Sequence, residues 1–307
     1  MAKDASDVTV IGHFSKDCII LPGKQPCAIL GGAVAYVSLV ARVLDVSASV
    51  ISKVGSDFPK AYMSQLKEAG VDTSLTVKVP SERTTSFELT YSEDLTSRDL
   101  TLRSQGSPIT LKELPSSFRS KVTHIAPIAA EINYEVVDHL RSCCECLSID
   151  PQGMTRQFDK NGHVSSSTEM DKRVLGLVDI YKSSLDEIKV LTGQSNLEKA
   201  IAAIHKIGPS TVIVTLGEKG SVLSTGHKIR QVPACRSKTV VDPTGAGDVF
   251  IGAFLAEYVR HKEPFLCASV GAAAASLVVE GVGTSFFGDK KEIYRRATII
   301  YGKEVET

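Results

Sequence analysis

The hydrophobic pattern alternates between compact apolar runs and segments with helical apolar spacing along most of the chain. Residues 8–11, 48–52 and 211–216 are short apolar runs, whereas residues 32–44 and 196–207 place apolar side chains at helical spacing. Compact apolar runs separated by helices are typical of parallel strands that are buried on both faces. The pattern therefore predicts an α/β protein whose central, mainly parallel sheet carries helices on both faces. The other expected strands are 122–125, 146–149 and 178–181, and the other expected helices lie near 62–69, 132–142, 168–176, 185–192, 246–260, 264–280 and 290–300.

Two segments interrupt this alternation. In residues 13–30 and 74–104, polar and apolar positions alternate, and the first segment contains a Pro/Gly turn. Such alternation is typical of short antiparallel strands with one solvated face. We therefore expect a small β lid inserted in a single domain that spans residues 1–307. A lid of this kind can close over a site and exclude water, and it could also carry a homodimer contact.

Charge and composition argue against several classes of partner. The chain has 35 basic and 35 acidic residues, so no basic excess favours nucleic acid. Residues 1–7 are polar and lack the apolar region of a secretory signal. The longest small and apolar stretch, residues 271–279, is far below the roughly 20 residues that a membrane span needs. We expect a cytoplasmic protein without a nucleic-acid or membrane partner.

Seven cysteines are present, and three of them cluster at Cys143, Cys144 and Cys146. A zinc site would need a further ligand and pairs at spacings such as C-x₂-C. This cluster instead runs directly into the apolar strand expected at 146–149. We interpret the cysteines as reduced, buried or half-buried thiols rather than as metal ligands.

The strongest chemical signal is the turn Asp-Pro-Thr-Gly-Ala-Gly-Asp at residues 242–248, which leads into an expected helix. Gly245, Ala246 and Gly247 would direct backbone N–H groups out of the helix start, whose partial positive charge suits a phosphate. An aspartate in the first turn, Asp248, would repel that phosphate unless it has a task of its own. It can accept the proton of an attacking hydroxyl group. The alternative is an acid that merely caps the helix.

This string resembles the C-terminal signature of the ribokinase-like (pfkB) carbohydrate kinases. The resemblance implies a three-layer sandwich and the transfer of the γ-phosphoryl group of ATP to an alcohol. It implies Mg²⁺ as a cofactor and a monovalent cation as a possible further one. It makes Asp248 the catalytic base and the backbone of Gly245, Ala246 and Gly247 an anion hole. It also places Asp242 near the assembly of Mg²⁺ and phosphate, with water between them.

Shorter matches to the same family follow in the family's order. Gly12 followed by Asp17 is similar to an early motif whose carboxylate accepts substrate hydroxyls, and Gly31-Gly32 is similar to the paired glycines of the substrate pocket. Residues 215–220 are similar to the loop on the nucleotide side. The resemblance therefore covers nearly the whole chain. The nucleotide contacts that it implies are Ser184, Thr215, Gly217, Gly220, Thr244, Gly245 and Gly247.

Two departures from the family pattern concern the metal and the acceptor. The family usually has Asn-x-x-Glu where this chain has Ser184-Leu185-Asp186-Glu187, and Glu187 can still order water bound to Mg²⁺. An asparagine is common a few residues after the paired glycines, where this chain has Tyr36. Ordinary recognition of ribose or fructose is therefore not expected, and we place Tyr36 among the residues that bind the acceptor.

Three segments look similar to the myo-inositol kinase branch, namely 183–187, 149–153 ahead of Arg156, and 242–244. Asp150 and Arg156 follow the carboxyl end of an expected strand, where ligands of α/β proteins bind. The alternative is a strand-end turn with a surface arginine. We expect both residues to bind the acceptor, with myo-inositol or a related carbohydrate favoured.

Other functions stay open at this point. A nucleoside kinase of the same family is one alternative, because Tyr36, Phe14 and Phe87 could build an aromatic slot for a base. A non-catalytic nucleotide or sugar sensor is another, although a sensor has no use for Asp248. A Rossmann dehydrogenase is not favoured, since no G-x-G-x-x-G follows the first strand. His124, at another strand end, is interpreted as structural or as part of the pocket wall.

Overall fold

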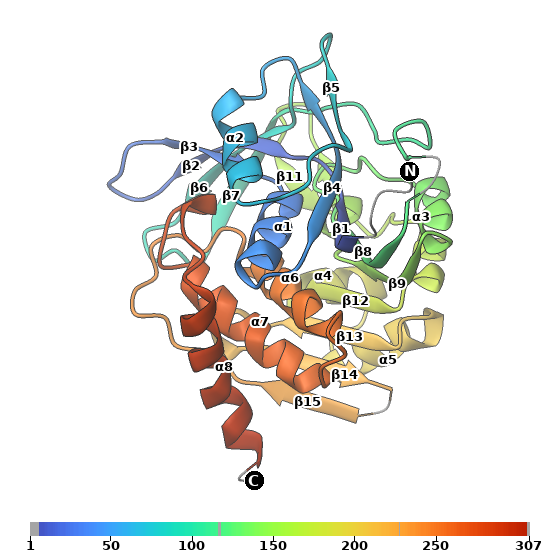
Figure 1. The fold of residues 1–307 in the computed structure, drawn as a ribbon, viewed down its shortest axis with the longest axis vertical. Coiled ribbons are helices and arrows are strands. Elements are labelled where there is room, and N and C mark those ends of the chain that lie inside the picture. Colours follow the sequence, from blue (N-terminus) through green and yellow to red (C-terminus); the bar gives the residue numbers. More distant parts are fainter. Residues whose placement is uncertain (1–5, 116–117, 227, 306–307) are drawn as a thin grey trace.

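The computed structural model describes residues 6–115, 118–226 and 228–305, so the polar residues 1–5 lie outside it. Within these ranges the larger sheet has nine strands in the order β15–β14–β13–β12–β9–β8–β1–β4–β5 (Figure 1). All pairings from β5 to β13 are parallel, and β14 and β15 add an antiparallel edge. The expected mainly parallel sheet is confirmed. Its strands are β1 Ser6–Ile11, β4 Ala48–Gly55, β5 Thr76–Val79, β8 Ser120–Ile125, β9 Cys144–Ile149, β12 Ile180–Ser184, β13 Thr211–Thr215, β14 Ser221–Thr225 and β15 Lys228–Val232.

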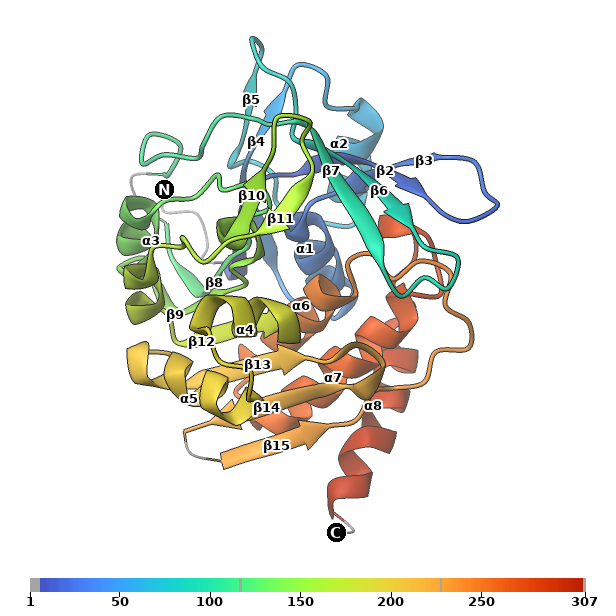
Figure 2. The ribbon, with the colours of Figure 1, turned by 180° about the vertical axis from the view of Figure 1, so that it is seen from behind.

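Helices cover both faces of this sheet. The helices α1, α2, α6, α7 and α8 lie on the face seen in Figure 1, and α3, α4 and α5 lie on the face seen in Figure 2. Val8 and Val10 of β1 belong to the core beneath the first group, and Ile11 belongs to the core beneath the second. Successive strand side chains point to opposite faces, so one strand contributes to both cores. The helices are α1 Ala33–Val43, α2 Lys60–Glu68, α3 Tyr134–Arg141, α4 Leu185–Thr192, α5 Leu197–Ile207, α6 Ala246–Tyr258, α7 Pro264–Val278 and α8 Lys290–Val305.

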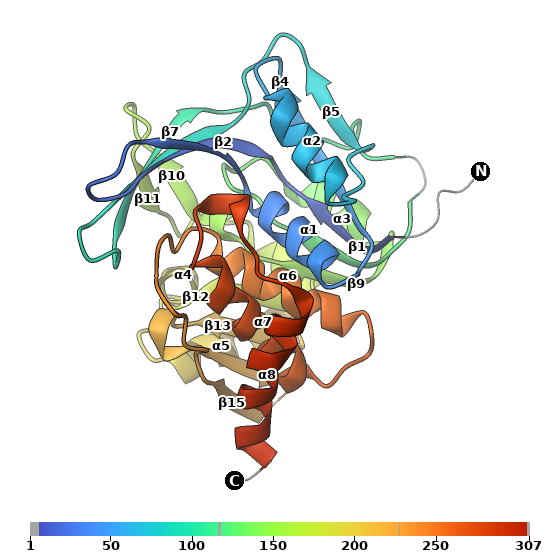
Figure 3. The ribbon, with the colours of Figure 1, turned by 60° about the vertical axis from the view of Figure 1, so that its left-hand side comes forward.

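Four strands form a second sheet in the order β3–β2–β6–β7, and we call these four strands the lid (Figure 3). The expectation that all of residues 74–104 belong to a lid is wrong, because β5 pairs in parallel with β4 of the main sheet. Purely antiparallel pairing is also wrong, because β2 and β6 run parallel. An edge strand of either sheet has one solvated face, so alternation alone does not assign it to a sheet. The lid strands are β2 Ser15–Ile20, β3 Cys27–Gly31, β6 Ser86–Tyr91 and β7 Arg98–Ser104.

The segment after β9 differs from the expected helix at 168–176. A hairpin of β10 (Arg156–Phe158) and β11 (Val164–Ser166) extends toward the lid, and a bridge joins His163 to Thr101 of β7. Only the short 3-10 helix η2, Lys172–Leu177, follows it, and Gly176 within that segment disfavours a longer helix. The other 3-10 helices are η1 Gln152–Thr155, η3 Gly217–Lys219 and η4 Gly283–Ser285. Across the described ranges, no helix is both long and apolar enough to cross a membrane.

Candidate active site

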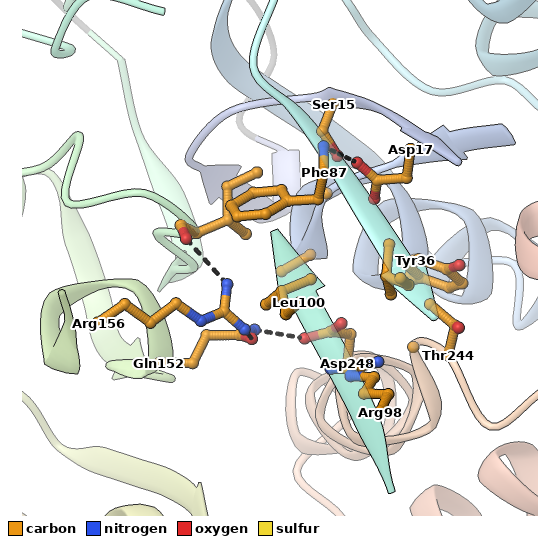
Figure 4. Close-up of a pocket in the computed structure, with 15 residues that line it drawn as sticks. Ser15, Asp17, Tyr36, Phe87, Arg98, Leu100, Gln152, Arg156, Thr244 and Asp248 are labelled. Carbon is orange, nitrogen blue, oxygen red and sulfur yellow. Dashed lines mark hydrogen bonds between the residues drawn. The ribbon is translucent and has the colours of Figure 1, made fainter. Parts of the chain in front are cut away.

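A pocket lies between the lid, the start of α6 and the loops that follow β8 and β9. Its empty space, counted together with the open solvent at its mouth, is about 410 Å³. Side chains from the lid face those from α6 and from the loop after β9 across this space (Figure 4). Seven of the residues expected from the sequence line it: Asp17, Gly32, Tyr36, Arg156, Thr244, Gly245 and Asp248.

Asp242 holds the turn before α6 in one conformation. This buried carboxylate accepts hydrogen bonds from the backbone N–H (2.9 Å) and the hydroxyl (2.6 Å) of Thr244, and from the N–H of Gly283 (2.8 Å). Gly245 has a φ of 77°, and a Cβ at this position would lie 2.3 Å from the Tyr36 ring. Glycine is therefore required here. The fixed turn presents the first backbone N–H groups of α6 as a ready-made anion site.

Asp248 is half-buried in the first turn of α6 and lines the pocket. The side-chain amide of Gln152 donates a hydrogen bond to Oδ1 of Asp248 at 3.1 Å (Figure 4). Burial raises the pKa of Asp248 to about 6, although the positive charges of Lys182, Arg156 and Arg98 act in the opposite direction. A carboxyl group with this pKa is ionised at neutral pH and is basic enough to take a proton, as general-base catalysis requires.

A buried ion pair between Lys182 and Asp150 lies next to the start of α6. The ammonium lies 2.5 Å from Oδ2 of Asp150, and the two side chains are only 6% and 1% exposed. A Cβ at Gly247 would lie 2.8 Å from Nζ of Lys182, so the positive charge borders the anion site directly. Burial lowers the pKa of Lys182, but the carboxylates of Asp150 and Asp248 outweigh this effect and leave it raised.

Lys182 was not among the residues expected from the sequence. Its signal was a lysine within the otherwise apolar start of β12, immediately before the two serines that end the strand. Asp150, which we expected to bind the acceptor, does not line the pocket but pairs with Lys182. Its contribution to acceptor binding stays a prediction.

One side of the pocket is built from β2 and the start of α1. The Asp17 carboxylate is 8% exposed and accepts a hydrogen bond from the backbone N–H of Phe87 at 3.2 Å. Burial raises the pKa of Asp17 to about 6. A Cβ at Gly31 would lie 2.0 Å from Oδ2 of Asp17, so this glycine leaves room for the carboxylate. The hydroxyl of Tyr36 is buried and has no hydrogen-bond partner among the described residues.

Four of the residues expected to contact the nucleotide lie at or just after the carboxyl ends of β12 and β13: Ser184, Thr215, Gly217 and Gly220. Ser184 and Thr215 are direct neighbours in the parallel register of these strands. Gly217 and Gly220 flank the turn that follows β13. The Ser184 hydroxyl accepts from the N–H of Glu187, and the Glu187 carboxylate accepts from the N–H of Ser184 at 2.7 Å, which forms a capping box at the start of α4. These residues do not line the pocket, and their contact with a nucleotide stays a prediction.

Residues 6–291 match the model of the pfkB family of carbohydrate kinases. The chain belongs to the PfkB family. It is therefore a kinase that acts on sugar or nucleoside hydroxyl groups, as its relatives do. A curated cytidine kinase from Thermococcus kodakarensis is 28% identical over 90% of this chain and 97% of its own length.

Two further relatives carry names that refer to inositol rather than to a nucleoside. The inositol 3-kinase of Arabidopsis thaliana is 26% identical over 91% of this chain and 76% of its own length. A solved pyrophosphate-dependent kinase of the ribokinase family, complexed with a pyrophosphate analog and myo-inositol, superposes with a TM-score of 0.78. It is 26% identical, and the match covers 90% of this chain and 96% of that structure. The ribokinase-like fold expected from the sequence is confirmed.

Two arginines complete the pocket of this PfkB kinase. Arg156 donates hydrogen bonds to the Ile128 carbonyl (2.8 Å) and to Oε1 of Gln152 (2.7 Å), and its guanidinium lies over the Phe87 ring. Arg98 reaches the same pocket from the lid strand β7. Arg98 was not expected from the sequence, because it is a single polar residue in a segment without a recognisable motif. Gln152 lies in the segment 149–153 that resembles the myo-inositol kinase branch, but it was not named as a site residue.

His124 and Phe14 lie outside the pocket of the kinase. His124 is completely buried in β8, where its Nδ1 is 3.0 Å from the hydroxyl of Ser148. Burial lowers the pKa of His124 to about 3, so its side chain is neutral at physiological pH. Its position within β8 fits a structural role. Phe14 packs against Phe58 in the core, with ring centroids 5.9 Å apart. The aromatic slot of Tyr36, Phe14 and Phe87 is therefore not assembled in this structure.

Proposed function

We propose that this PfkB kinase transfers the γ-phosphoryl group of ATP to a hydroxyl of a small polyol, with myo-inositol as the favoured acceptor. The observation that carries the proposal is the polarity of opposite pocket walls. Asp17 and Tyr36 line one wall, on which the Asp17 carboxylate is the polar group, and Gln152, Arg156 and Asp248 line the other. A cyclic polyol carries hydroxyl groups around its whole ring, so it can satisfy donors and acceptors on both sides at once.

The geometry supports an in-line transfer that depends mainly on positioning and electrostatics. Asp17 would hold acceptor hydroxyls, so that one of them lies against Asp248 and gives up its proton to that carboxylate. The start of α6 and the ammonium of Lys182 would stabilise the negative charge of the phosphoryl group. The lid would exclude water, which would otherwise compete as acceptor.

The donor is proposed to be ATP with Mg²⁺. Mg²⁺ in kinases is held by one or two carboxylates, substrate phosphates and water rather than by an all-protein cage. Among the described residues, no group of three His, Cys, Asp or Glu side chains is arranged to hold a metal. Glu187 would hold a water of the metal, and Asp242 would act through the turn that it fixes. Mg²⁺ would neutralise phosphate charge. A monovalent-cation requirement and a homodimer through the lid stay predictions.

A nucleoside is the second candidate acceptor. The lid contributes an apolar surface of Phe87, Leu89 and Leu100 to the pocket, and such a surface can cover a nucleobase. The polar wall opposite the lid would then bind the ribose hydroxyls. Relatives that carry the names cytidine kinase and nucleoside kinase support the same reading.

A panel assay separates these candidates. The purified enzyme is incubated with Mg²⁺ and either ATP or pyrophosphate, and the acceptors are myo-inositol, hexoses, ribose and nucleosides. The proposal expects the highest kcat/KM with myo-inositol or a related polyol and with ATP as donor. A preference for a nucleoside would show that the acceptor is a nucleoside rather than a polyol. Turnover with pyrophosphate but not with ATP would show that pyrophosphate is the donor.

Asp17→Ala should weaken acceptor binding while donor binding is preserved. A hydrogen bond to a charged group contributes about 1.5–3 kcal/mol, which corresponds to roughly ten- to a hundredfold in affinity. The measurement is the acceptor KM at saturating donor, together with the donor KM at saturating acceptor. If the acceptor KM is unchanged, Asp17 contributes only to the structure of the lid and does not bind the acceptor. An equal change in both KM values would instead indicate that the lid itself is disturbed.

Glu187→Gln should raise the Mg²⁺ concentration that gives half-maximal activity more than it changes the acceptor KM. Loss of an outer-shell carboxylate typically costs about 10- to 100-fold in metal affinity. Glutamine can retain the capping hydrogen bond to the N–H of Ser184, so the fold of α4 is preserved. A Mg²⁺ titration that superposes on that of the wild type would refute a metal role for Glu187.

A further inference from the structure

Arg98 is a cation that the lid itself brings to the reaction centre. It stands at the start of β7 and lines the pocket together with Asp248 (Figure 4). Its positive charge is among those that lower the pKa of Asp248, while burial raises it. The second guanidinium of the pocket, that of Arg156, comes from β10 on the opposite side. The two arginines therefore approach the catalytic carboxylate from different parts of the fold.

A chain of hydrogen bonds connects Arg98 to the anion-binding turn. Nη1 of Arg98 donates to the Tyr91 hydroxyl at 3.0 Å, and that hydroxyl lies 2.7 Å from Oγ1 of Thr244. Oγ1 of Thr244 in turn donates to Asp242 at 2.6 Å. Arginine can only donate and a carboxylate can only accept, so the Tyr91 hydroxyl donates to Thr244. The direction of the whole chain is thereby fixed, and it links the lid to the start of α6.

Neither guanidinium is neutralised by a carboxylate. In the part of the chain that the structure describes, Arg98 bonds to Tyr91, and Arg156 bonds to a carbonyl and an amide oxygen; no ion pair is formed by either. Burial and the charge of Arg98 both lower the pKa of Arg156, so the two cations repel each other across the pocket. Two cations that face one space favour negative charge there, of which Asp248 and Asp17 supply a part and a phosphoryl group would supply more.

The lid also contains an arginine in the ordinary situation of a surface residue. Arg103 stands on the same strand, is 53% exposed, and pairs with Glu88 at 2.6 Å. It does not line the pocket. Arg98 and Arg103 are both exposed, so they differ in their partners: Arg103 pairs with Glu88, whereas Arg98 bonds to Tyr91 and lines the pocket together with Asp248.

We propose that Arg98 is a catalytic residue of the lid that contacts the transferring phosphoryl group, and that the Tyr91–Thr244 hydrogen bond holds it in place when the lid is closed. This inference rests on the proposed phosphotransfer. The acceptor oxygen forms a bond to the phosphorus as the bond from phosphorus to the departing donor oxygen breaks. The acceptor proton passes to Asp248, and the nucleoside diphosphate leaves with the electron pair. Arg98 forms no covalent bond but stabilises the oxygens of the phosphoryl group in transit.

The test compares Arg98→Met with Arg103→Met in the full-length enzyme, using whichever acceptor the wild type phosphorylates best. Removal of one charge-stabilising donor typically lowers kcat by about 10²–10³-fold, and we expect this loss in Arg98→Met with little change in the acceptor KM. Arg103→Met should stay close to the wild type. Equal losses in both variants, or a normal kcat in Arg98→Met, would overturn the proposal. An effect confined to the acceptor KM would also overturn it, because Arg98 would then bind the acceptor.

Three further measurements strengthen the test. Guanidinium ion added to Arg98→Ala should restore part of kcat, which a purely structural role would not allow. Tyr91→Phe removes the contact to Thr244 but keeps Arg98, so its kcat should fall less than that of Arg98→Met.

Calorimetry with Mg²⁺, ADP and aluminium fluoride, a mimic of the phosphoryl group in transit, requires no known acceptor. The wild type should bind this mixture more tightly than ADP alone, and Arg98→Met should bind the two equally. If Arg98→Met still binds the mixture more tightly than ADP alone, the proposal is overturned, even if no acceptor is found in the panel assay.

Discussion

Replacing Asp248 with asparagine should lower kcat by about 10²–10⁴-fold, the usual contribution of a positioned general base. The amide has the same shape and can still accept the hydrogen bond from Nε2 of Gln152, so the start of α6 should keep its conformation. It cannot take the acceptor proton at neutral pH. Donor affinity, measured by calorimetry, should be preserved or increased, because a negative charge beside the anion site is removed.

The matched control for Asp248→Asn is Glu198→Gln. Glu198 is also an acid in the first turn of a helix, α5, but it is exposed and does not line the pocket. If Asp248 served only as a favourable charge at a helix start, the two substitutions would have similar small effects on stability and none on turnover. An Asp248→Asn enzyme with near-normal kcat would remove the base assignment.

The pH profile gives a second measurement of the same assignment. The base must be ionised, so activity should be full above the pKa of Asp248 and should be lost as the pH falls through about 6. Asp17 has a raised pKa of about 6 as well, and its protonation would weaken acceptor binding in the same range. The variant Asp17→Asn separates the two groups. The part of the acid-side decrease in kcat/KM that comes from protonation of Asp17 should disappear, whereas the acid-side decrease in kcat that comes from protonation of Asp248 should remain.

Local features of this site were predictable from the sequence because they depend on neighbouring residues. The turn at 242–248 needs glycine where φ is positive, an aspartate that fixes the turn, and an acid in the first helical turn, and all of these stand within one short string. The alternation of apolar runs and helices likewise indicated the main sheet, since burial of strands on both faces leaves a direct trace in the sequence.

The contacts that join distant segments were not predictable in this way. Gln152 and Asp248 are 96 residues apart, and Tyr91 and Thr244 are 153 apart. Their meeting depends on the strand order of the main sheet and on the placement of the lid, which no spacing in the sequence reveals. The lid boundary shows the same limit: β5 and β6 have similar alternation, yet one joins the main sheet and the other the lid.

Lys182→Met should reduce both stability and turnover. Asp150 would remain buried without its partner, and breaking a buried ion pair from one side costs about 3–5 kcal/mol. The variant should therefore unfold at a markedly lower Tm. Turnover should fall by about 10²–10³-fold, the typical effect of losing one charge that stabilises a developing anion, because Nζ of Lys182 borders the anion site at Gly247.

The double variant Lys182→Met/Asp150→Asn separates these two effects. Removing both charges abolishes the uncompensated carboxylate, and replacement of a whole buried pair is often close to neutral for stability. Asparagine can still accept the hydrogen bond from the backbone N–H of Gln152 that Oδ1 of Asp150 accepts now. We expect the double variant to recover much of the lost Tm but little of the lost kcat, since the cation beside Gly247 stays absent. If kcat returned together with Tm, Lys182 would act on catalysis only through the fold, and the charge that stabilises the phosphoryl group would have to come from the start of α6 and the pocket arginines alone.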